Sequence, residues 1–214
     1  MDLSLQSAPY LHIGFAFLHI ALGEGLSAWV YRRRYGRSPL VLYTAADSPH
    51  RRVSRRIAWA GLAWALALFV PALRPGYARS LLAPLGEFPP GLSWGLAAAG
   101  MLFMVTAQLR MGEAFRVGQD AAWAPAGLVT EGLHGLSRNP IYLGSMASLL
   151  GMSLWLPSLA VLGAWGVLAW QIDQLVGCEE AFLAGRFPEA WARYAGEVPR
   201  YVGWRGYRER GGRS

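Results

Sequence analysis

Long apolar stretches dominate this chain of 214 residues and constrain its fold more than any other feature. Hydrophobic residues make up 54% of the sequence and charged residues only 15%, whereas a soluble domain has about 25% charged residues. Without a bilayer, tryptophan-containing runs such as 57–73 and 91–109 would have nowhere to be buried. We therefore expect an all-α, polytopic integral membrane protein rather than a soluble helical bundle.

The apolar runs predict about five transmembrane helices. The expected spans are residues 10–31, 57–73, 92–109, 140–155 and 158–176. Pro157 separates the last two spans and predicts a tight hairpin. Each arm of this hairpin is shorter than the roughly 20 residues that a full crossing needs. We therefore expect the hairpin to dip steeply into the membrane or to pack within the bundle.

One domain is expected over residues 1–214. In this interpretation residues 1–109 form the first three spans, residues 110–201 form the remaining spans and a cytoplasmic helical C-terminal region, and residues 202–214 form a tail. The sequence has one cysteine, Cys178, so no internal disulfide is possible and no cysteine-based metal site is indicated.

The basic residues predict how the chain is oriented. The net charge is +7, every basic residue is arginine, and the arginines lie beside the apolar runs, so nucleic-acid binding is not indicated. Eight arginines follow the first span and only two follow the second. The positive-inside rule then places the N-terminus outside and the C-terminus in the cytoplasm, as an odd number of spans also does. We expect the protein to lie in a bacterial inner membrane.

The first span carries three ionisable side chains, which are costly inside a membrane and often functional. His12 and His19 are seven residues apart and share one helix face, and Glu24 follows. They either pair structurally within the bundle or take part in substrate access. A metal site is not indicated, because the spacing offers no third ligand.

A polar segment punctuated by glycines, residues 128–144, runs straight into the fourth apolar helix. Further on, Glu179 and Glu180 stand at the end of the fifth span, where the helix dipole and the inner leaflet would favour arginine. Glu179 or Glu180 is expected to point back at a ligand held by the polar segment. The aromatic residues that follow them are equally typical of an amphipathic interfacial helix.

The ordered motifs resemble the isoprenylcysteine carboxyl methyltransferase family and its bacterial and phospholipid-methylating relatives. The first motif is Leu-Val-Thr-Glu-Gly at 128–132, the second is Arg-Asn-Pro-Ile-Tyr-Leu-Gly at 138–144, and the third is Glu-Glu-Ala-Phe-Leu at 179–183. Phe187, Trp191, Tyr194 and Val198-Pro199-Arg200 follow in family order. The resemblance covers residues 108–201, and it implies that residues 110–201 form the catalytic and cofactor-binding part.

This resemblance implies an S-adenosylmethionine-dependent methyltransferase that acts on a lipophilic acceptor in the membrane. The acceptor group could be a carboxylate, an amine, a thiol or a lipid head group. The implied cofactor-binding residues are Val129, Gly132, His134, Asn139, Pro140, Tyr142, Gly144, Glu179 and Glu180. The implied catalytic residues are Arg138, Glu180 and Arg200, and the implied acceptor-binding residues are Arg116, Trp170 and Tyr194. No metal is implied, and the oligomeric state stays open.

Asn139 departs from the family pattern, which frequently has histidine there. Asparagine can hydrogen-bond but cannot carry a proton near neutral pH, so an acid–base role at this position is excluded. Two other functions remain: a non-enzymatic membrane carrier or scaffold, and a nicotinamide-dependent membrane reductase. The first does not explain the polar motifs clustered on one side, and the short chain argues against the second.

Overall fold

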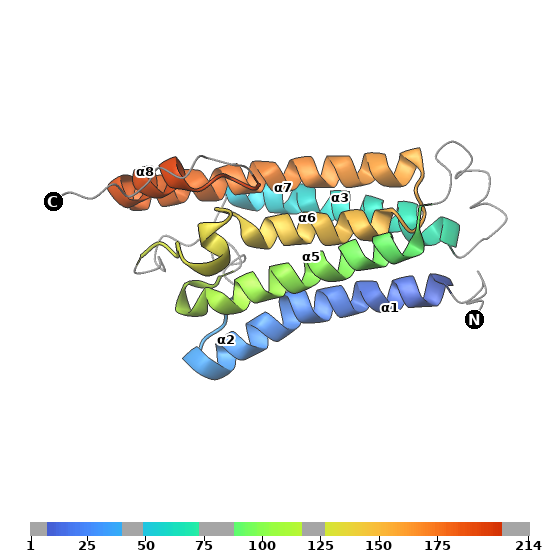
Figure 1. Ribbon diagram of the computed structural model, residues 1–214, viewed down its shortest axis with the longest axis horizontal. Coiled ribbons are helices and arrows are strands. Elements are labelled where there is room, and N and C mark those ends of the chain that lie inside the picture. Colours follow the sequence, from blue (N-terminus) through green and yellow to red (C-terminus); the bar gives the residue numbers. More distant parts are fainter. Residues whose placement is uncertain (1–7, 40–48, 73–87, 117–126, 203–214) are drawn as a thin grey trace.

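The computed structural model describes residues 8–39, 49–72, 88–116 and 127–202 of the chain. The prediction of an all-α fold is confirmed, because these residues form helices and no strands. The helices run back and forth along one long axis (Figure 1), so that α1 begins at the opposite end from where α7 finishes.

The first pass consists of α1 (Ala8–Ile20), a π-helical turn (Ala21–Leu26) and α2 (Ser27–Tyr35). The other long helices are α3 (Pro49–Ala72), α5 (Pro90–Arg110) and α7 (Leu159–Arg186). Two shorter helices are α6 (Pro140–Ser153) and α8 (Pro188–Glu197). Short 3₁₀ turns occupy Gly112–Ala114 and Gly132–Gly135.

Four helices, not five, are long and apolar enough to cross a membrane within the described ranges. They are Leu11–Tyr35, Pro49–Val70, Pro90–Arg110 and Leu159–Arg186. The fourth predicted span, α6, has only 14 residues, about 21 Å of helix against the roughly 30 Å of a bilayer core. The count of about five full spans is therefore not confirmed, although α6 and α7 do form the expected hairpin.

The prediction that both arms of this hairpin are short is wrong for α7. This helix has 28 residues and continues to Arg186, ten residues beyond the predicted end. Ser158 precedes it as the N-cap, and the Ser158 hydroxyl accepts a hydrogen bond from the amide of Val161. Glu179 and Glu180 therefore lie within a continuous helix and not after it.

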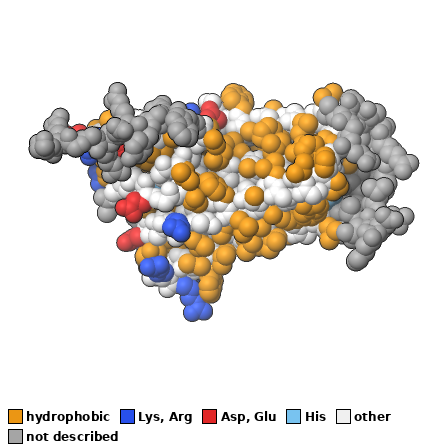
Figure 2. All heavy atoms as spheres, viewed as in Figure 1, with side chains coloured by type: hydrophobic (Ala, Val, Ile, Leu, Met, Phe, Trp, Pro, Cys, Tyr) orange, Lys and Arg blue, Asp and Glu red, His pale blue; other side chains and the backbone are white. Residues whose placement is uncertain are grey.

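Large apolar side chains cover the middle of the bundle (Figure 2), whereas charged side chains gather at the end where α2 and α5 finish. Phe17, Trp59 and Leu159 are each at least 68% exposed. Such exposure is unfavourable in water and ordinary against lipid. The distribution is compatible with an integral membrane protein.

The histidines of the first pass contact neighbouring helices and not each other. The imidazole of His12 stacks on Trp155, with ring centroids 4.0 Å apart. Nδ1 of His19 lies 3.0 Å from the hydroxyl of Ser148 on α6. Both face the bundle, as expected, but they do not pair with each other. The side chain of Glu24 lies outside the described part of the chain.

Glycines bring α5 and α6 into backbone contact. A Cβ added at Gly144 would lie 2.6 Å from the amide nitrogen of Met104 and 2.7 Å from the carbonyl oxygen of Gly100. Gly100 and Gly151 face equally tight backbone contacts across the same interface. Gly144 was predicted to contact a cofactor, but its buried position indicates helix packing instead.

Gly144→Ala is therefore expected to destabilise the protein by about 1–3 kcal/mol, the usual range for overpacking. Gly163→Ala on the exposed face of α7 is the matched control, because nothing lies within 4 Å of its added Cβ. Thermal unfolding in detergent, followed by circular dichroism, should show a lower Tm for Gly144→Ala only. Equal Tm values for the two variants would contradict the close-packing assignment.

Candidate functional site

A cavity of about 480 Å³ opens at the charged end of the bundle, within the size range typical of small-ligand sites. Its walls come from α3, the end of α5, the segment that leads into α6, and from α6, α7 and α8. Nine of the predicted site residues line it: Arg116, Val129, His134, Arg138, Asn139, Pro140, Tyr142, Glu179 and Tyr194. The folded chain thus gathers residues that are up to 78 positions apart.

Glu180 does not line the cavity and is held instead in a network of ion pairs. Its Oε1 accepts from Nε of Arg138 at 3.1 Å and from Nδ2 of Asn139 at 2.9 Å. Its Oε2 accepts from Nη2 of Arg200 at 2.8 Å and from Nε of the same residue at 3.1 Å. We call these four residues the Glu180 clasp. Both carboxylate oxygens are occupied, which favours bracing over contact with a ligand.

The Glu180 clasp also joins three backbone segments. The amide of Arg138 donates to the carbonyl of Pro199 at 2.9 Å, and Nη1 of Arg138 donates to the carbonyl of Ala195 at 3.0 Å. Nδ2 of Asn139 donates to the carbonyl of Arg200 at 3.3 Å. The hydrogen bond from Arg200 to Glu180 is the main cause that raises the pKa of the guanidinium. The clasp thus fixes the start of α6 against α7 and the segment after α8.

Asn139 has a defined function in this network. Its amide donates to Glu180 irrespective of pH, whereas a neutral histidine donates from only one ring nitrogen. The sequence excludes a proton-carrying role for Asn139. Its place in the structure agrees with this, because the side chain here must always donate a hydrogen bond to Glu180.

Glu179 is the carboxylate that faces the cavity. The hydroxyl of Tyr142, in the first turn of α6, donates to Oε1 of Glu179 at 2.6 Å. Nε2 of His50 lies 3.5 Å from the same oxygen. The side chain of Glu179 is 29% exposed. Glu179 therefore supplies a negative charge that a ligand in the cavity can reach.

Arg116 brings a positive charge to the same cavity, where a substrate-binding role was predicted. Its guanidinium carbon lies 5.0 Å from the centre of the Phe182 ring. Burial lowers the pKa of Arg116, while the nearby Glu179 and Tyr142 raise it. The cavity thus holds a cationic and an anionic side chain within electrostatic reach of each other.

His134 and Tyr194 close the cavity on the side of α8. The imidazole of His134 is buried, and its Nδ1 has no hydrogen-bond partner among the described residues. Burial lowers the pKa of this imidazole. The Tyr194 hydroxyl donates to the carbonyl oxygen of His134 at 2.7 Å. A buried ring nitrogen without a partner indicates that a ligand group could bind there.

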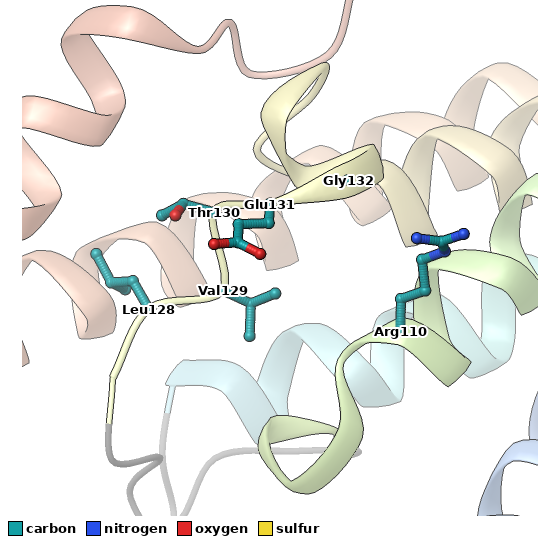
Figure 3. Close-up of a pocket in the computed structure, with 6 residues that line it drawn as sticks. All are labelled: Arg110, Leu128, Val129, Thr130, Glu131 and Gly132. Atoms are coloured by element: carbon teal, nitrogen blue, oxygen red, sulfur yellow. The ribbon is translucent and has the colours of Figure 1, made fainter.

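Two other predicted site residues lie away from this cavity. Gly132 lines a second hollow of about 370 Å³, together with Arg110 and residues 128–131 (Figure 3). Its φ of +61° is a conformation that glycine adopts readily. Trp170 is 58% exposed on the outer face of α7 and does not line the cavity. Its position does not support the predicted contact with an acceptor at this site.

Sequence reasoning missed His50, which lines the cavity from the first turn of α3. It lies beside a run of arginines that was interpreted only as a sign of orientation. The signal available in the sequence was a histidine four residues before Ser54, on one helix face at the same charged end.

In the described part of the chain, no three His, Cys, Asp or Glu side chains are grouped to hold a metal.

The Glu180 clasp predicts that Glu180→Gln is strongly destabilising, by about 3 kcal/mol, because it leaves two partly buried arginines without their carboxylate. Glu197→Gln at the exposed end of α8 is the control, with no expected loss. Thermal unfolding of both variants in detergent checks this. A wild-type Tm for Glu180→Gln would show that the clasp contributes nothing to stability.

Tyr194 predicts an alkaline loss of stability. Burial raises the pKa of its phenol from 10.0 to about 12, so its contribution is complete below pH 10 and is lost as the pH rises towards 12. Tyr194→Phe should cost about 1 kcal/mol at neutral pH and should reduce the loss of Tm between pH 8 and pH 11. Tyr35→Phe serves as the control and should keep the full alkaline loss.

Comparison with known proteins supports the resemblance noted in the sequence. The model of a family described as phospholipid methyltransferase matches residues 91–190. This stretch runs from the start of α5 to the start of α8 and includes the junction before α6 and both glutamates. No curated protein matches the chain. Over this stretch the chain therefore matches the family that its motifs resemble, and the match suggests membrane methyltransferase activity.

Proposed function

Because residues 91–190 carry the phospholipid methyltransferase pattern, we propose that this protein transfers a methyl group from S-adenosylmethionine to a lipophilic acceptor in the membrane. The observation that carries the proposal is the composition of the cavity. Charged and hydrogen-bonding groups from the polar end meet apolar walls from α3, α6 and α7 in one space.

The residues present fit S-adenosylmethionine, which the family generally uses. The cofactor has a carboxylate, an ammonium group, a sulfonium, two ribose hydroxyls and an adenine ring. Arg116 is suited to the carboxylate, and Glu179 with Tyr142 is suited to a cationic group. The unpartnered Nδ1 of His134 offers a hydrogen bond. The N-terminus of α6 adds free amide groups and a positive dipole end.

The apolar part of the cavity is suited to an acceptor that comes from the lipid. Ile57 and Ala58 contribute from α3, Ile141 from α6, and Ile172 and Leu175 from α7. Ala58 is exposed on the outer surface of α3 and also lines the cavity. A lipid tail can therefore remain in the bilayer while the reactive group reaches Glu179.

The bound cofactor would supply an electrophilic methyl group on a positively charged sulfur. Methyl transfer needs mainly alignment of the acceptor atom and exclusion of water. The Glu180 clasp orients the start of α6, and Glu179 and Arg116 are positioned to hold opposite charges of the bound molecule. In this mechanism no side chain becomes covalently modified, so Cys178 has a packing role.

The orientation is also part of the proposal. The described arginines of α2, α3 and α5 gather at the end of the bundle that holds the cavity. The positive-inside rule places such an end in the cytoplasm, where S-adenosylmethionine is available. The N-terminus would then lie outside, in a bacterial inner membrane.

Binding of S-adenosylmethionine to detergent-purified protein tests the function, with NADPH titrated in parallel. We expect saturable binding of S-adenosylmethionine and none of NADPH. Glu179→Gln and Tyr142→Phe should each weaken binding about tenfold or more, because a charge-assisted hydrogen bond contributes roughly 1.5–3 kcal/mol. Isothermal titration calorimetry provides the dissociation constants.

Glu197→Gln is the matched control and should bind as the wild type does. Folded protein that fails to bind S-adenosylmethionine would refute the methyltransferase. Binding of NADPH instead would favour a membrane reductase, and binding of neither would favour a carrier or scaffold.

A further inference from the structure

His50 combines burial with an available ring nitrogen. Its side chain is 4% exposed, and Nε2 is buried without a hydrogen-bond partner in the described part of the chain. The same residue lines the cavity. It belongs to α3 and lies outside the matched stretch 91–190, so the family pattern assigns it no role. An unsatisfied buried ring nitrogen is rare and requires an explanation.

The contacts of Ser54 favour one tautomer of the His50 imidazole. The Ser54 hydroxyl donates its only proton to the carbonyl oxygen of His50 at 2.9 Å. The same hydroxyl oxygen lies 3.4 Å from Nδ1 of the ring. With the proton of Ser54 used in this way, its oxygen can accept a hydrogen bond from Nδ1. In that tautomer Nδ1 carries the hydrogen, and Nε2 presents a lone pair at the cavity.

A carboxylate that is itself held in place lies beside Nε2. Oε1 of Glu179 on α7 is 3.5 Å away, and the Tyr142 hydroxyl on α6 holds that carboxylate in place at 2.6 Å. Arg116, after α5, also lies within electrostatic reach of Glu179 and Tyr142. On α3 itself, the contacting polar group is Ser54. An imidazole that accepts a proton here becomes a cation beside an anchored carboxylate.

We propose that Nε2 of His50 accepts the proton that the acceptor loses during methyl transfer, an inference that rests on the proposed function. The attacking atom forms a bond to the methyl carbon as the methyl–sulfur bond breaks and its electron pair stays on sulfur. The proton on the attacking atom moves to Nε2 and later passes to water. Glu179 balances the charge of the imidazolium.

This assignment restricts the class of acceptor. A carboxylate reaches the site already ionised and has no proton to lose, so it would leave His50 without a function. An acceptor whose attacking nitrogen, sulfur or oxygen carries a hydrogen needs such a base. The geometry therefore points to a lipophilic acceptor that bears an N–H, S–H or O–H group.

The first test is spectroscopic and needs no turnover. The chain has four histidines, so ¹⁵N-histidine labelling gives few signals, and His50→Gln assigns the one that disappears. At alkaline pH we expect an unprotonated Nε2 and a protonated Nδ1 in His50. Ser54→Ala should reduce this preference. A hydrogen on Nε2 in the wild type would overturn the proposal, whatever the activity measurements show.

The second test separates proton transfer from binding. Labelled methyl transfer is measured with phosphatidylethanolamine in mixed micelles, which carries N–H groups, and with N-acetyl-S-farnesylcysteine, which presents a carboxylate. For the N–H acceptor, His50→Gln should lower kcat about 100-fold or more, the scale of general base catalysis. Its affinity for S-adenosylmethionine, measured by calorimetry, should stay within about threefold of the wild type.

Arg56→Gln, on the same helix and exposed, is the control and should keep the wild-type kcat. An unchanged kcat in His50→Gln with the N–H acceptor would refute the base. Methylation of the carboxylate acceptor alone would also refute it and would leave the methyltransferase standing. Loss of S-adenosylmethionine binding by wild-type protein would instead refute the proposed function. If neither probe is methylated, the ¹⁵N-histidine measurement decides. An unprotonated Nε2 supports the proposal, and a hydrogen on Nε2 overturns it.

Discussion

The Glu180 clasp is the interaction on which the arrangement of the site depends. One carboxylate accepts four hydrogen bonds, from Arg138, Asn139 and Arg200. These partners come from the segment before α6 and from the segment after α8, whereas Glu180 belongs to α7. Without the clasp, each of these segments would have to be held by weaker contacts at the edge of the membrane. With it, Tyr142 is fixed opposite Glu179, one residue away from the clasp.

The two adjacent glutamates illustrate how a helix divides similar residues between different tasks. Successive positions on an α-helix point about 100° apart. Glu180 therefore faces the paired arginines while Glu179 faces the cavity. The close contact of α5 with α6 at Gly144 supports this division, because it fixes α6 and thus the position of its first turn. The packing at Gly144 and the position of Tyr142 in the cavity are therefore coupled, because both residues belong to the start of α6.

A large part of the fold could be predicted from the sequence. Apolar length and scarce charge determine an all-α membrane protein, and Pro157 marks the hairpin. The length of α7 could not be predicted, because its polar final turns continue the helix beyond the apolar run. The site was predicted in part: the motifs identified Tyr142, Glu179 and Arg138. His50 was missed, since its spacing from Ser54 gives no sign of the distant residues, such as Glu179, that it contacts in the folded chain.

The sequence by itself determined the class of fold, the charged end, and the family pattern between residues 91 and 190. Hydrophobic periodicity and motif spacing are local properties, so the chain alone contains them. Only the tertiary structure decided which glutamate faces the cavity, that Gly144 packs helices together, and that Trp170 lies on the outer surface. It also brought His50 to Glu179, 129 positions later in the chain. These assignments depend on helix rotation and on contacts between distant segments, which packing alone determines.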